Sequence, residues 1–212
     1  MKSGQQHKAK IKKVANVSIL IGLILVAIPA GFWVNAMYYQ WNQSKKWEPL
    51  LVAHTNKTHT AKNSLTSPSD LVDRSPVKSG DNIAYLEIPA LNLNVSVLEG
   101  ATWENLAKGP VHVSNTAKIG DAGTALISGH RTMYAAPFHN LNNLKAGDKI
   151  ILYTKKAVFT YMVVGLKRVN PDDWSEVKPN SEPRLVLSTC DPMYSAAQRL
   201  LAISRLISAE KL

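Results

Sequence analysis

An uncharged stretch near the N-terminus places the strongest constraint on how this chain can fold. Residues 14–44 contain no Asp, Glu, Lys or Arg, and residues 14–34 are mostly apolar. A helix needs about 20 apolar residues to cross the ~30 Å hydrocarbon core of a bilayer. The run is longer than the apolar core of a secretory signal peptide, and it lacks an Ala-x-Ala cleavage site. We therefore expect an uncleaved transmembrane signal anchor at residues 14–34.

The residues on either side of this run predict its orientation. The preceding tail, residues 1–13, carries five lysines and no acidic residue. Basic flanks remain in the cytoplasm, and aromatic side chains collect at membrane interfaces. We expect a single-pass protein with its N-terminus in the cytoplasm and everything from residue 35 onward outside. The aromatic residues at the outer end are Phe32, Trp33, Tyr38, Tyr39 and Trp41.

The formal net charge of +10 does not indicate a nucleic-acid partner. Half of that charge comes from the lysines of the N-terminal tail, whereas residues 81–212 hold fourteen basic against twelve acidic residues. A nucleic-acid-binding protein concentrates positive charge on its folded domain. We therefore expect no nucleic-acid binding.

The remaining chain divides into two parts by composition and periodicity. Residues 35–80 are rich in Asn, Thr, Ser, Lys and Pro, which predicts a solvated stalk with little means of packing. From residue 81 the apolar residues alternate in short runs separated by Pro, Asn and Gly, and only two short helices are expected, around 102–108 and 138–144. Residues 81–212 are therefore predicted to form one all-β barrel or sandwich.

The only cysteine of the chain ends one of these apolar runs, residues 185–190. A lone cysteine outside the cytoplasm cannot form an internal disulfide, so a reactive thiol is the natural interpretation of Cys190. The next apolar run opens with Arg199. If the two runs are antiparallel neighbours joined by residues 191–198, Cys190 and Arg199 lie about one strand spacing, ~5 Å, apart.

An imidazole follows another predicted strand, residues 124–129, at His130. An ordinary thiol has a pKa of about 8.5 and is mostly protonated at pH 7, so a neighbouring imidazole can supply the missing basicity. Arg131 competes with Arg199 as the cationic group, but adjacent strand residues point to opposite faces. No second thiol exists and the histidines show no ligand spacing, so neither a metal nor another cofactor is expected.

These motifs resemble those of the sortases, a family of cysteine transpeptidases. The segment Val186-Leu187-Ser188-Thr189-Cys190 resembles their Thr-Leu-x-Thr-Cys signature, with Val186 in place of the first threonine, and Gly129-His130 resembles their catalytic histidine motif. The resemblance covers residues 81–212 and implies a closed, eight-stranded sortase-type β-barrel. Further segments are most similar to class E sortases: Leu86-Glu87-Ile88-Pro89, Gly109-Pro110-Val111-His112, and His130 to Tyr134.

The resemblance also implies roles for individual residues. Cys190 would be the nucleophile, His130 the proton donor and acceptor, and Arg199 the group that stabilises the oxyanion. The implied reaction cleaves a sorting signal of the Leu-Ala-x-Thr-Gly or Leu-Pro-x-Thr-Gly kind between Thr and Gly. A thioacyl enzyme then passes the surface protein to an amine of a cell-wall precursor or to a pilin lysine, in a Gram-positive-type envelope. Candidate substrate-binding residues are Thr189, Tyr134 and His112.

Two alternatives remain open from the sequence. One is a non-catalytic peptide-binding or scaffolding protein on the same barrel, which the joint presence of Cys190, His130 and Arg199 disfavours. The other is a sortase that polymerises pilins. An L,D-transpeptidase is disfavoured because Thr189, and not the glycine of that family's His-Gly-Cys motif, precedes Cys190.

Overall fold

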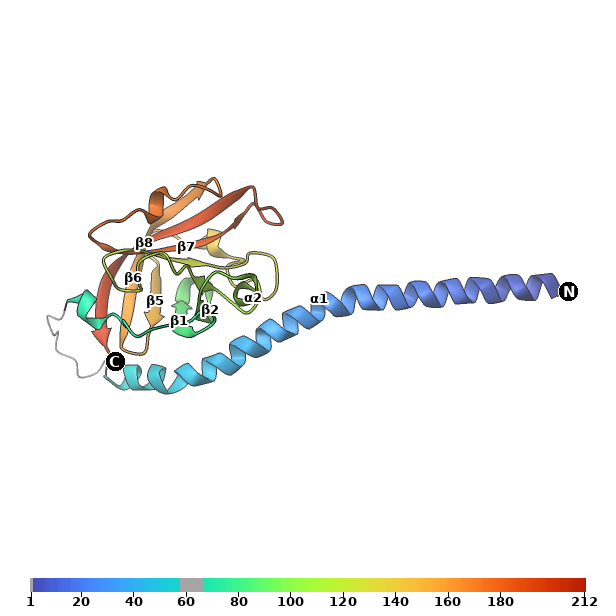
Figure 1. Ribbon diagram of the computed structural model, residues 1–212, viewed down its shortest axis with the longest axis horizontal. Coiled ribbons are helices and arrows are strands. Elements are labelled where there is room, and N and C mark those ends of the chain that lie inside the picture. Colours follow the sequence, from blue (N-terminus) through green and yellow to red (C-terminus); the bar gives the residue numbers. More distant parts are fainter. Residues whose placement is uncertain (1, 58–66) are drawn as a thin grey trace.

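The chain forms a long N-terminal helix and a closed β-barrel (Figure 1). The computed structural model describes residues 2–57 and 67–212, and the side chains of residues 11–53 and 67–212. Eight strands close the barrel in the order β1-β2-β3-β4-β7-β8-β6-β5, as predicted. The strands are β1 (Asn82–Ile88), β2 (Leu93–Glu99), β3 (Val111–His112), β4 (Gly123–Ser128), β5 (Lys149–Tyr153), β6 (Ala157–Val169), β7 (Pro183–Asp191) and β8 (Gln198–Lys211).

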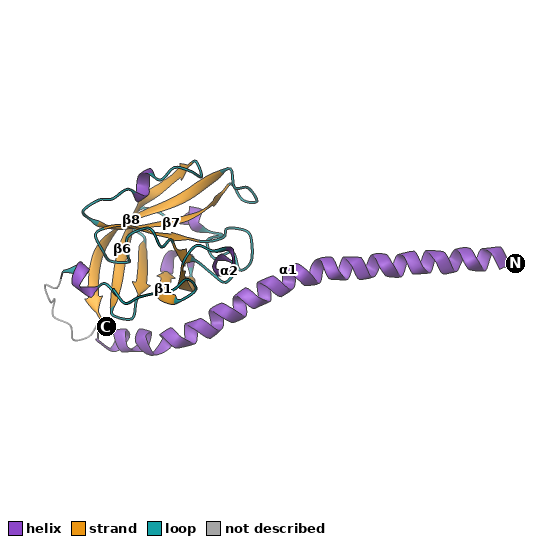
Figure 2. Cartoon of the chain, in the orientation of Figure 1, coloured by secondary structure: helices purple, strands orange, loops and turns teal. Residues whose placement is uncertain are grey.

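Helical structure in the barrel is confined to single turns (Figure 2). The helix expected around 102–108 is α2 (Trp103–Leu106), whose first turn is capped by the Thr102 hydroxyl accepting from the Asn105 N–H at 3.3 Å. The helix expected around 138–144 is a 3₁₀ turn, η3 (Leu141–Asn143). The other turns of this kind are η1 (Pro68–Leu71), η2 (Pro89–Leu91) and η4 (Ser175–Val177).

Strand alternation gives the barrel wall two apolar faces. On β7, Leu185 and Leu187 point into the main core, which also contains Phe138, Phe159 and Tyr161. Val186 points outward into a second, smaller cluster on the outside of the wall. Both faces are buried, so β7 reads as a continuous apolar run. The outer cluster consists of Leu126, Val169, Val186 and Leu201, with Val113, Val177 and Ile203 packed against it.

The N-terminal helix α1 (Lys2–Lys57) contains a stretch long and apolar enough to cross a membrane. Its side chains in the predicted span, residues 14–34, are exposed. Helix α1 extends away from the barrel as a rod and turns alongside the barrel only in its last part (Figure 1). An apolar helix that the protein does not cover is consistent with the membrane anchor expected from the sequence.

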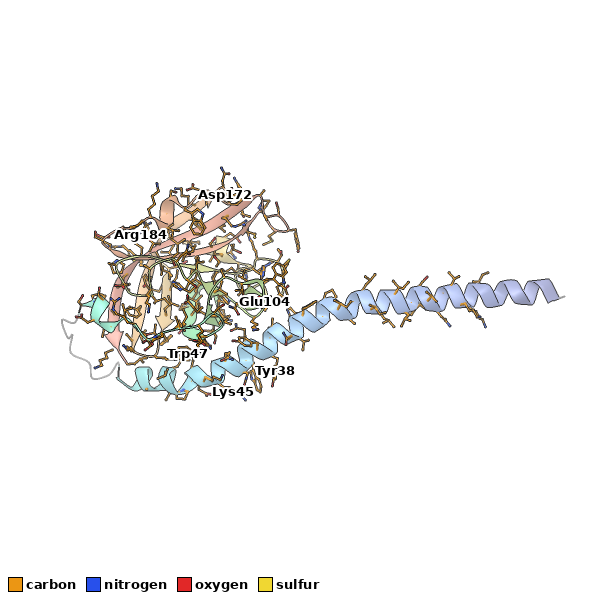
Figure 3. All side chains as sticks on the ribbon, in the orientation of Figure 1. Tyr38, Lys45, Trp47, Glu104, Asp172 and Arg184 are labelled. Atoms are coloured by element: carbon orange, nitrogen blue, oxygen red, sulfur yellow. The ribbon has the colours of Figure 1, made fainter. Side chains whose placement is uncertain are left out.

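The segment after the span differs from the solvated stalk that its composition predicts. Helix α1 continues to Lys57, and Ala36, Gln43 and Trp47 are buried against the barrel. Figure 3 shows Trp47 between the helix and the strands, whereas Tyr38 and Lys45 lie on other sides of α1. The part of the expected stalk at residues 58–66 lies outside the described residues.

The physical reason for this docking is an unpaired sheet edge. Strand β2 is paired with β1 along its length but with β3 only at Leu98 and Glu99, which leaves the β3-side edge of its earlier residues without a partner strand. The Gln40 amide fills this gap: its Oε1 accepts from the Ser96 N–H at 2.8 Å, and its Nε2 donates to the Ser96 carbonyl at 3.3 Å and to the Lys108 carbonyl at 2.9 Å. Covering an open edge in this way satisfies buried backbone groups.

The packed part of the chain also begins before residue 81. Leu71, the last residue of η1, belongs to the main core, and Val72 is buried. Arg74 forms an ion pair with Asp121 at 2.9 Å. Residues 68–80 therefore follow the barrel surface, because the buried side chains of Leu71 and Val72 hold this short segment against it. Composition alone assigns the segment to a stalk.

Candidate active site

Three adjacent strands, β4, β7 and β8, bring the predicted catalytic residues to one place. Cys190 of β7 lies directly opposite Arg199 of antiparallel β8. Strand β4 runs parallel to β7, with Ser128 beside Ser188. His130 lies two residues beyond Ser128, the last residue of β4, just as Cys190 lies two residues beyond Ser188, and both line one cavity with Arg199. The order across the wall is therefore His130, Cys190, Arg199.

The three side chains share the outer face of the barrel wall. Alternate residues of a strand point to opposite faces, and Leu185, Leu187 and Leu200 lie in the inner core. Cys190 and Arg199 differ from these positions by odd numbers of residues, so both belong to the outer face, on the same side as the outer apolar cluster.

A cavity of about 410 Å³ opens along this outer face. Its apolar floor includes Leu126, Val169 and Leu201, and Trp174 and Val177 from the β6–β7 connection form a side wall. Cys190, the only cysteine, is partly exposed in it as a free thiol. The cavity has the form of a groove for an extended apolar peptide with a reactive polar end. The residues at that end are Ser128, Gly129, His130, Ser188, Thr189, Cys190 and Arg199.

The imidazole of His130 is contacted by aromatic rings, and its buried nitrogen forms no hydrogen bond in the described part of the chain. Its buried Nε2 has no hydrogen-bond partner among the described residues. The Tyr134 ring lies 5.1 Å from the imidazole and the Trp103 ring 6.0 Å, measured between centroids. Burial disfavours the imidazolium and lowers the pKa of His130 below its usual 6.5. The neutral imidazole, which can accept a proton, therefore dominates at pH 7.

Arg199 is anchored at one nitrogen only. Its Nη1 donates to the carbonyl of Ala196 in the β7–β8 connection at 3.1 Å and to that of Gln198, the first residue of β8, at 3.2 Å. Nε and Nη2 make no hydrogen bond within the described ranges. A guanidinium fixed at one end and open at the other can donate to an oxygen that enters the cavity.

Gly129 and Thr189 fix the backbone on which His130 lies. The Thr189 hydroxyl donates to the Gly129 carbonyl at 2.8 Å, which ties β7 to the end of β4. A Cβ on Gly129 would lie 2.7 Å from the Phe138 ring, so only glycine permits this packing. Phe138 is fully buried, and its N–H donates to the His130 carbonyl at 3.1 Å.

Comparison with known proteins agrees with this geometry. A family model described as Sortase domain matches residues 86–207, more than half of the chain. This chain belongs to the sortase family. Sortase D of Bacillus subtilis (strain 168) is 28% identical over 183 residues, which are 86% of this chain and 90% of the relative. Sortase A of Bacillus anthracis is 24% identical over 200 residues, covering 88% and 93% of the two chains.

Solved structures resemble this sortase in the barrel. Sortase E from Streptomyces avermitilis superposes with a TM-score of 0.59 at 32% identity, covering 64% of this chain and 93% of that one. A sortase D5 transpeptidase from Clostridium perfringens has the same TM-score at 28% identity, with 63% and 83% covered. Sortases are cysteine transpeptidases that act on surface proteins, and this chain is one. Relatives named A, D and E all occur, so the resemblance is not confined to class E.

A second arginine of this sortase, Arg131, stabilises the backbone around Cys190. Arg131 is buried and donates to the Cys190 carbonyl at 3.2 Å and, in a short ion pair, to Asp191. Asp191 also accepts from Arg168 Nε at 2.7 Å. Burial alone would raise the pKa of Asp191, but the hydrogen bonds from Arg168 and Arg131 outweigh it and lower the pKa. Arg131 therefore holds the β7 backbone and does not enter the cavity, as strand parity predicts.

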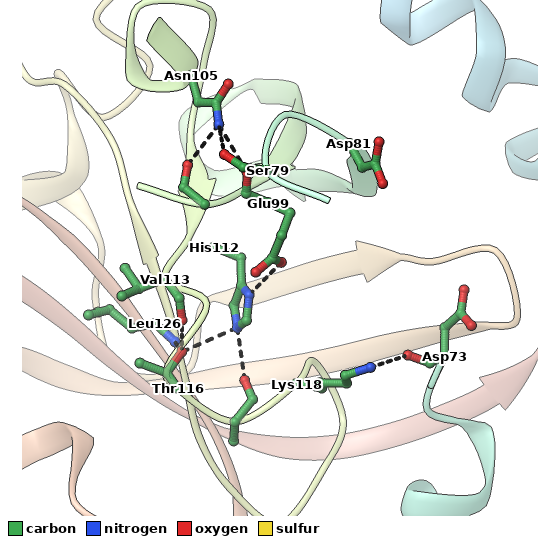
Figure 4. A network of polar contacts seen from close by, with 12 residues as sticks. Asp73, Ser79, Asp81, Glu99, Asn105, His112, Val113, Thr116, Lys118 and Leu126 are labelled. Carbon is green, nitrogen blue, oxygen red and sulfur yellow. Dashed lines mark hydrogen bonds and ion pairs between the residues drawn. The ribbon is translucent and has the colours of Figure 1, made fainter. Parts of the chain in front are cut away.

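Two of the candidate substrate-binding residues lie outside the cavity of this sortase. His112 is buried, with Nδ1 2.9 Å from Glu99 and Nε2 2.9 Å from the Ala117 carbonyl (Figure 4). Its place in a closed polar network fits a structural role. Tyr134 contacts the back of His130 and borders a different cavity, between α1 and β2. Thr189 lines the catalytic cavity, but its hydroxyl is used by Gly129.

Three contributors to the site were not singled out from the sequence. Ser128 and Ser188 line the cavity two residues before His130 and Cys190, as strand parity could have indicated. Trp103 contacts His130 from α2, and no local pattern connects positions 27 residues apart. The sequence also offers Asp172, Asp173 and Glu176 in the loop before β7 as calcium ligands, an interpretation disfavoured because acids in a solvent loop usually bind no metal; Glu176 pairs with Lys167 and Arg184. Among the described residues, no group of three His, Cys, Asp or Glu could hold a metal.

Proposed function

We propose that this sortase cleaves a sorting signal of the Leu-Ala-x-Thr-Gly or Leu-Pro-x-Thr-Gly kind between Thr and Gly, with Cys190 as nucleophile. The observation that carries the proposal is the arrangement of His130, Cys190 and Arg199 on three neighbouring strands at the end of an apolar groove. The apolar floor suits the Leu and the Ala or Pro of such a signal, and the reactive end suits its Thr-Gly bond.

The first half-reaction follows from the chemistry of these groups. His130 accepts the Cys190 proton, and the sulfur attacks the threonine carbonyl. Arg199 donates hydrogen bonds to the oxyanion, whose charge exists only in the transition state and intermediate. When the C–N bond breaks, His130 returns the proton to the leaving glycine amine, and a thioester remains on Cys190.

The second half-reaction transfers the surface protein to an acceptor amine. The amine attacks the thioester, His130 takes up its proton, and the thiol of Cys190 is regenerated with a new amide bond. We propose an amine of a cell-wall precursor or of a lysine on another surface protein as the acceptor. Residues 14–34 would hold the enzyme in the cell membrane with the N-terminus in the cytoplasm, as their apolar length and basic flank indicate.

The test uses the full chain in detergent micelles with quenched Leu-Ala-x-Thr-Gly and Leu-Pro-x-Thr-Gly peptides and a free amine. We expect cleavage between Thr and Gly and an acyl adduct on Cys190 by mass spectrometry, both absent in Cys190→Ala. A folded wild-type chain that forms no adduct with either peptide would overturn the proposed signal.

A matched pair of arginine variants tests the oxyanion role. Arg199→Ala is expected to lower kcat/KM by about a hundredfold or more, the usual cost of losing a preorganised oxyanion donor. Arg205 lies on the same strand opposite Arg184, at the other end of the wall, so Arg205→Ala should leave kcat/KM unchanged. Equal effects of the two substitutions would remove Arg199 from the mechanism.

A further inference from the structure

A series of ring contacts connects the N-terminal helix with the proposed catalytic histidine. The Phe32 ring of α1 meets the Tyr134 ring edge-on, with centroids 5.9 Å apart and planes at 90°. The Tyr134 ring in turn lies 5.1 Å from the imidazole of His130. Trp103 contacts both rings at 6.0 Å. Edge-to-face pairs at these separations are attractive beyond their buried area.

This packing is what orients the imidazole. In serine and cysteine enzymes a third group, usually a carboxylate or amide, fixes the base by a hydrogen bond. The buried Nε2 of His130 has no such partner among the described residues. The ring contacts from Tyr134 and Trp103 therefore take the place of that hydrogen bond.

Tyr134 reaches His130 from an unusual backbone conformation. Its φ is +56°, a left-handed value that a bulky side chain rarely adopts. Such a conformation persists only where surrounding contacts impose it, and it is common at functional sites. The ring of Phe32 is one of the contacts that hold the Tyr134 side chain in place.

Phe32 is itself held in place relative to the barrel. Helix α1 is fixed two turns beyond it by the three hydrogen bonds of Gln40 to Ser96 and Lys108. Further along, the side-chain amides of Gln43 and Asn82 lie 3.2 Å apart, and Trp47 packs on Tyr85 with ring centroids 6.5 Å apart. A continuous helix transmits this fixation back to Phe32.

We propose that α1 is part of the catalytic apparatus, with Tyr134 as a positioning residue that Phe32 holds against His130. The inference rests on the proposed role of His130 and extends it to the membrane helix. The predicted span ends at residue 34, so Phe32 would lie at the membrane surface, and the geometry of the base would depend on how α1 is docked.

The test follows the thiol directly and needs no sorting signal. Because Cys190 is the only cysteine, the rate of alkylation of the full chain by iodoacetamide in micelles reports this thiol alone. His130→Ala defines the part of the pH–rate profile that depends on the imidazole. Phe32→Ala and Tyr134→Ala are expected to move the profile toward that of His130→Ala, with an about three- to tenfold lower rate at pH 7.

Two variants serve as controls. Trp33→Ala removes the neighbouring aromatic ring of α1, for which no contact with Tyr134 exists in the described structure, and should behave as wild type. Tyr134→Phe keeps the ring and should restore the profile. The double variant Phe32→Ala/Tyr134→Ala should equal Tyr134→Ala alone, because coupled residues are not additive.

A substitution on the barrel tests the docking itself. A Cβ on Gly109 would collide with Gln40 Nε2 and lie 3.3 Å from the Ser96 carbonyl, so Gly109→Ala displaces the Gln40 amide. We expect Gly109→Ala to reproduce the Phe32→Ala profile, and Gln40→Ala provides the same test if Gly109→Ala lowers the melting temperature.

The outcomes separate the two proposals. A profile that changes in His130→Ala but stays at wild type in Phe32→Ala, Gly109→Ala and Gln40→Ala would overturn the role of α1 and leave the catalytic assignment standing. A profile unaffected by His130→Ala would overturn both. Normal alkylation behaviour with no peptide cleavage would reject only the sorting signal.

Discussion

At the scale of single residues, strand alternation separates the side chains that face the cavity from those that support the backbone. Cys190 and Arg199 face the cavity, whereas Thr189 and Arg131 secure the backbone from behind through the carbonyls of Gly129 and Cys190. Reactive and supporting groups are therefore sequence neighbours with opposite orientations.

The pKa of His130 gives a prediction at this scale. Burial lowers it, so the base is neutral and active down to a pH below 6.5, and the acid limb of the acylation rate should have its midpoint below that value. Trp103→Ala exposes the imidazole to water and should move this midpoint upward, measured by burst kinetics between pH 5 and 8. Trp41→Ala, which removes an exposed ring of α1, should leave it unchanged. An identical midpoint in both variants would contradict burial as the cause.

At the scale of elements, the β7–β8 corner depends on a buried carboxylate between two arginines. Asp191 is 5% exposed and accepts from Arg131, which is buried, and from Arg168, which is largely exposed. Removing a partner from a buried ion pair leaves an uncompensated charge, whereas an exposed partner contributes little. The same carboxylate thus has one structural and one peripheral partner.

We predict unequal costs for the two arginines. Arg131→Met should lower the free energy of unfolding by about 3 kcal/mol, and Arg168→Met by less than about 1 kcal/mol, measured by denaturant titration. The pKa of Asp191 is lowered in the folded protein, so its stabilisation is complete above its unfolded pKa of about 3.9 and is lost as the pH falls through the folded value. The difference between Arg131→Met and wild type should therefore shrink below pH 4. Equal losses in the two variants would contradict the assignment.

At the scale of the whole molecule, the barrel and the convergence of His130, Cys190 and Arg199 on one cavity could be predicted from the sequence, but the course of α1 could not. Period-two runs and the Cys190–Arg199 spacing specify local strands and their pairing, and the register confirms both. The helix beyond residue 34 is stabilised by contacts far away in sequence, above all Gln40 with Ser96 and Trp47 with Tyr85. Composition does not encode such tertiary contacts.

The same tertiary dependence limited the assignment of individual side chains. The sequence makes His112 a candidate substrate-binding residue, but its ring nitrogens lie within hydrogen-bond distance of the Ala117 carbonyl and of Glu99, which the pairing of β2 with β3 places beside it. Strand β3 is two residues long, too short for any periodicity. Trp103 and Tyr134 approach His130 from loops whose conformation depends on the surrounding structure.

Docking of α1 gives a prediction for the molecule as a whole. Trp47 is 4% exposed, so Trp47→Ala should loosen the helix from the barrel and abolish slow hydrogen exchange in residues 40–50, measured by mass spectrometry. Trp41→Ala, on an exposed position of the same helix, should preserve that protection. Slow exchange that survives Trp47→Ala would show that Gln40 and Gln43 suffice.

The continuity of α1 has a consequence for substrate access if the helix spans a membrane as proposed. With residues 14–34 across the bilayer, as proposed, the thirteen helical steps from Val34 to Trp47 rise only about 20 Å, and the barrel is fixed along them. A flexible tether would let the groove move to different distances from the membrane surface. A docked helix holds the groove at one distance. We therefore expect such an enzyme to favour surface proteins whose cleavage motif lies at that distance from their own membrane segment.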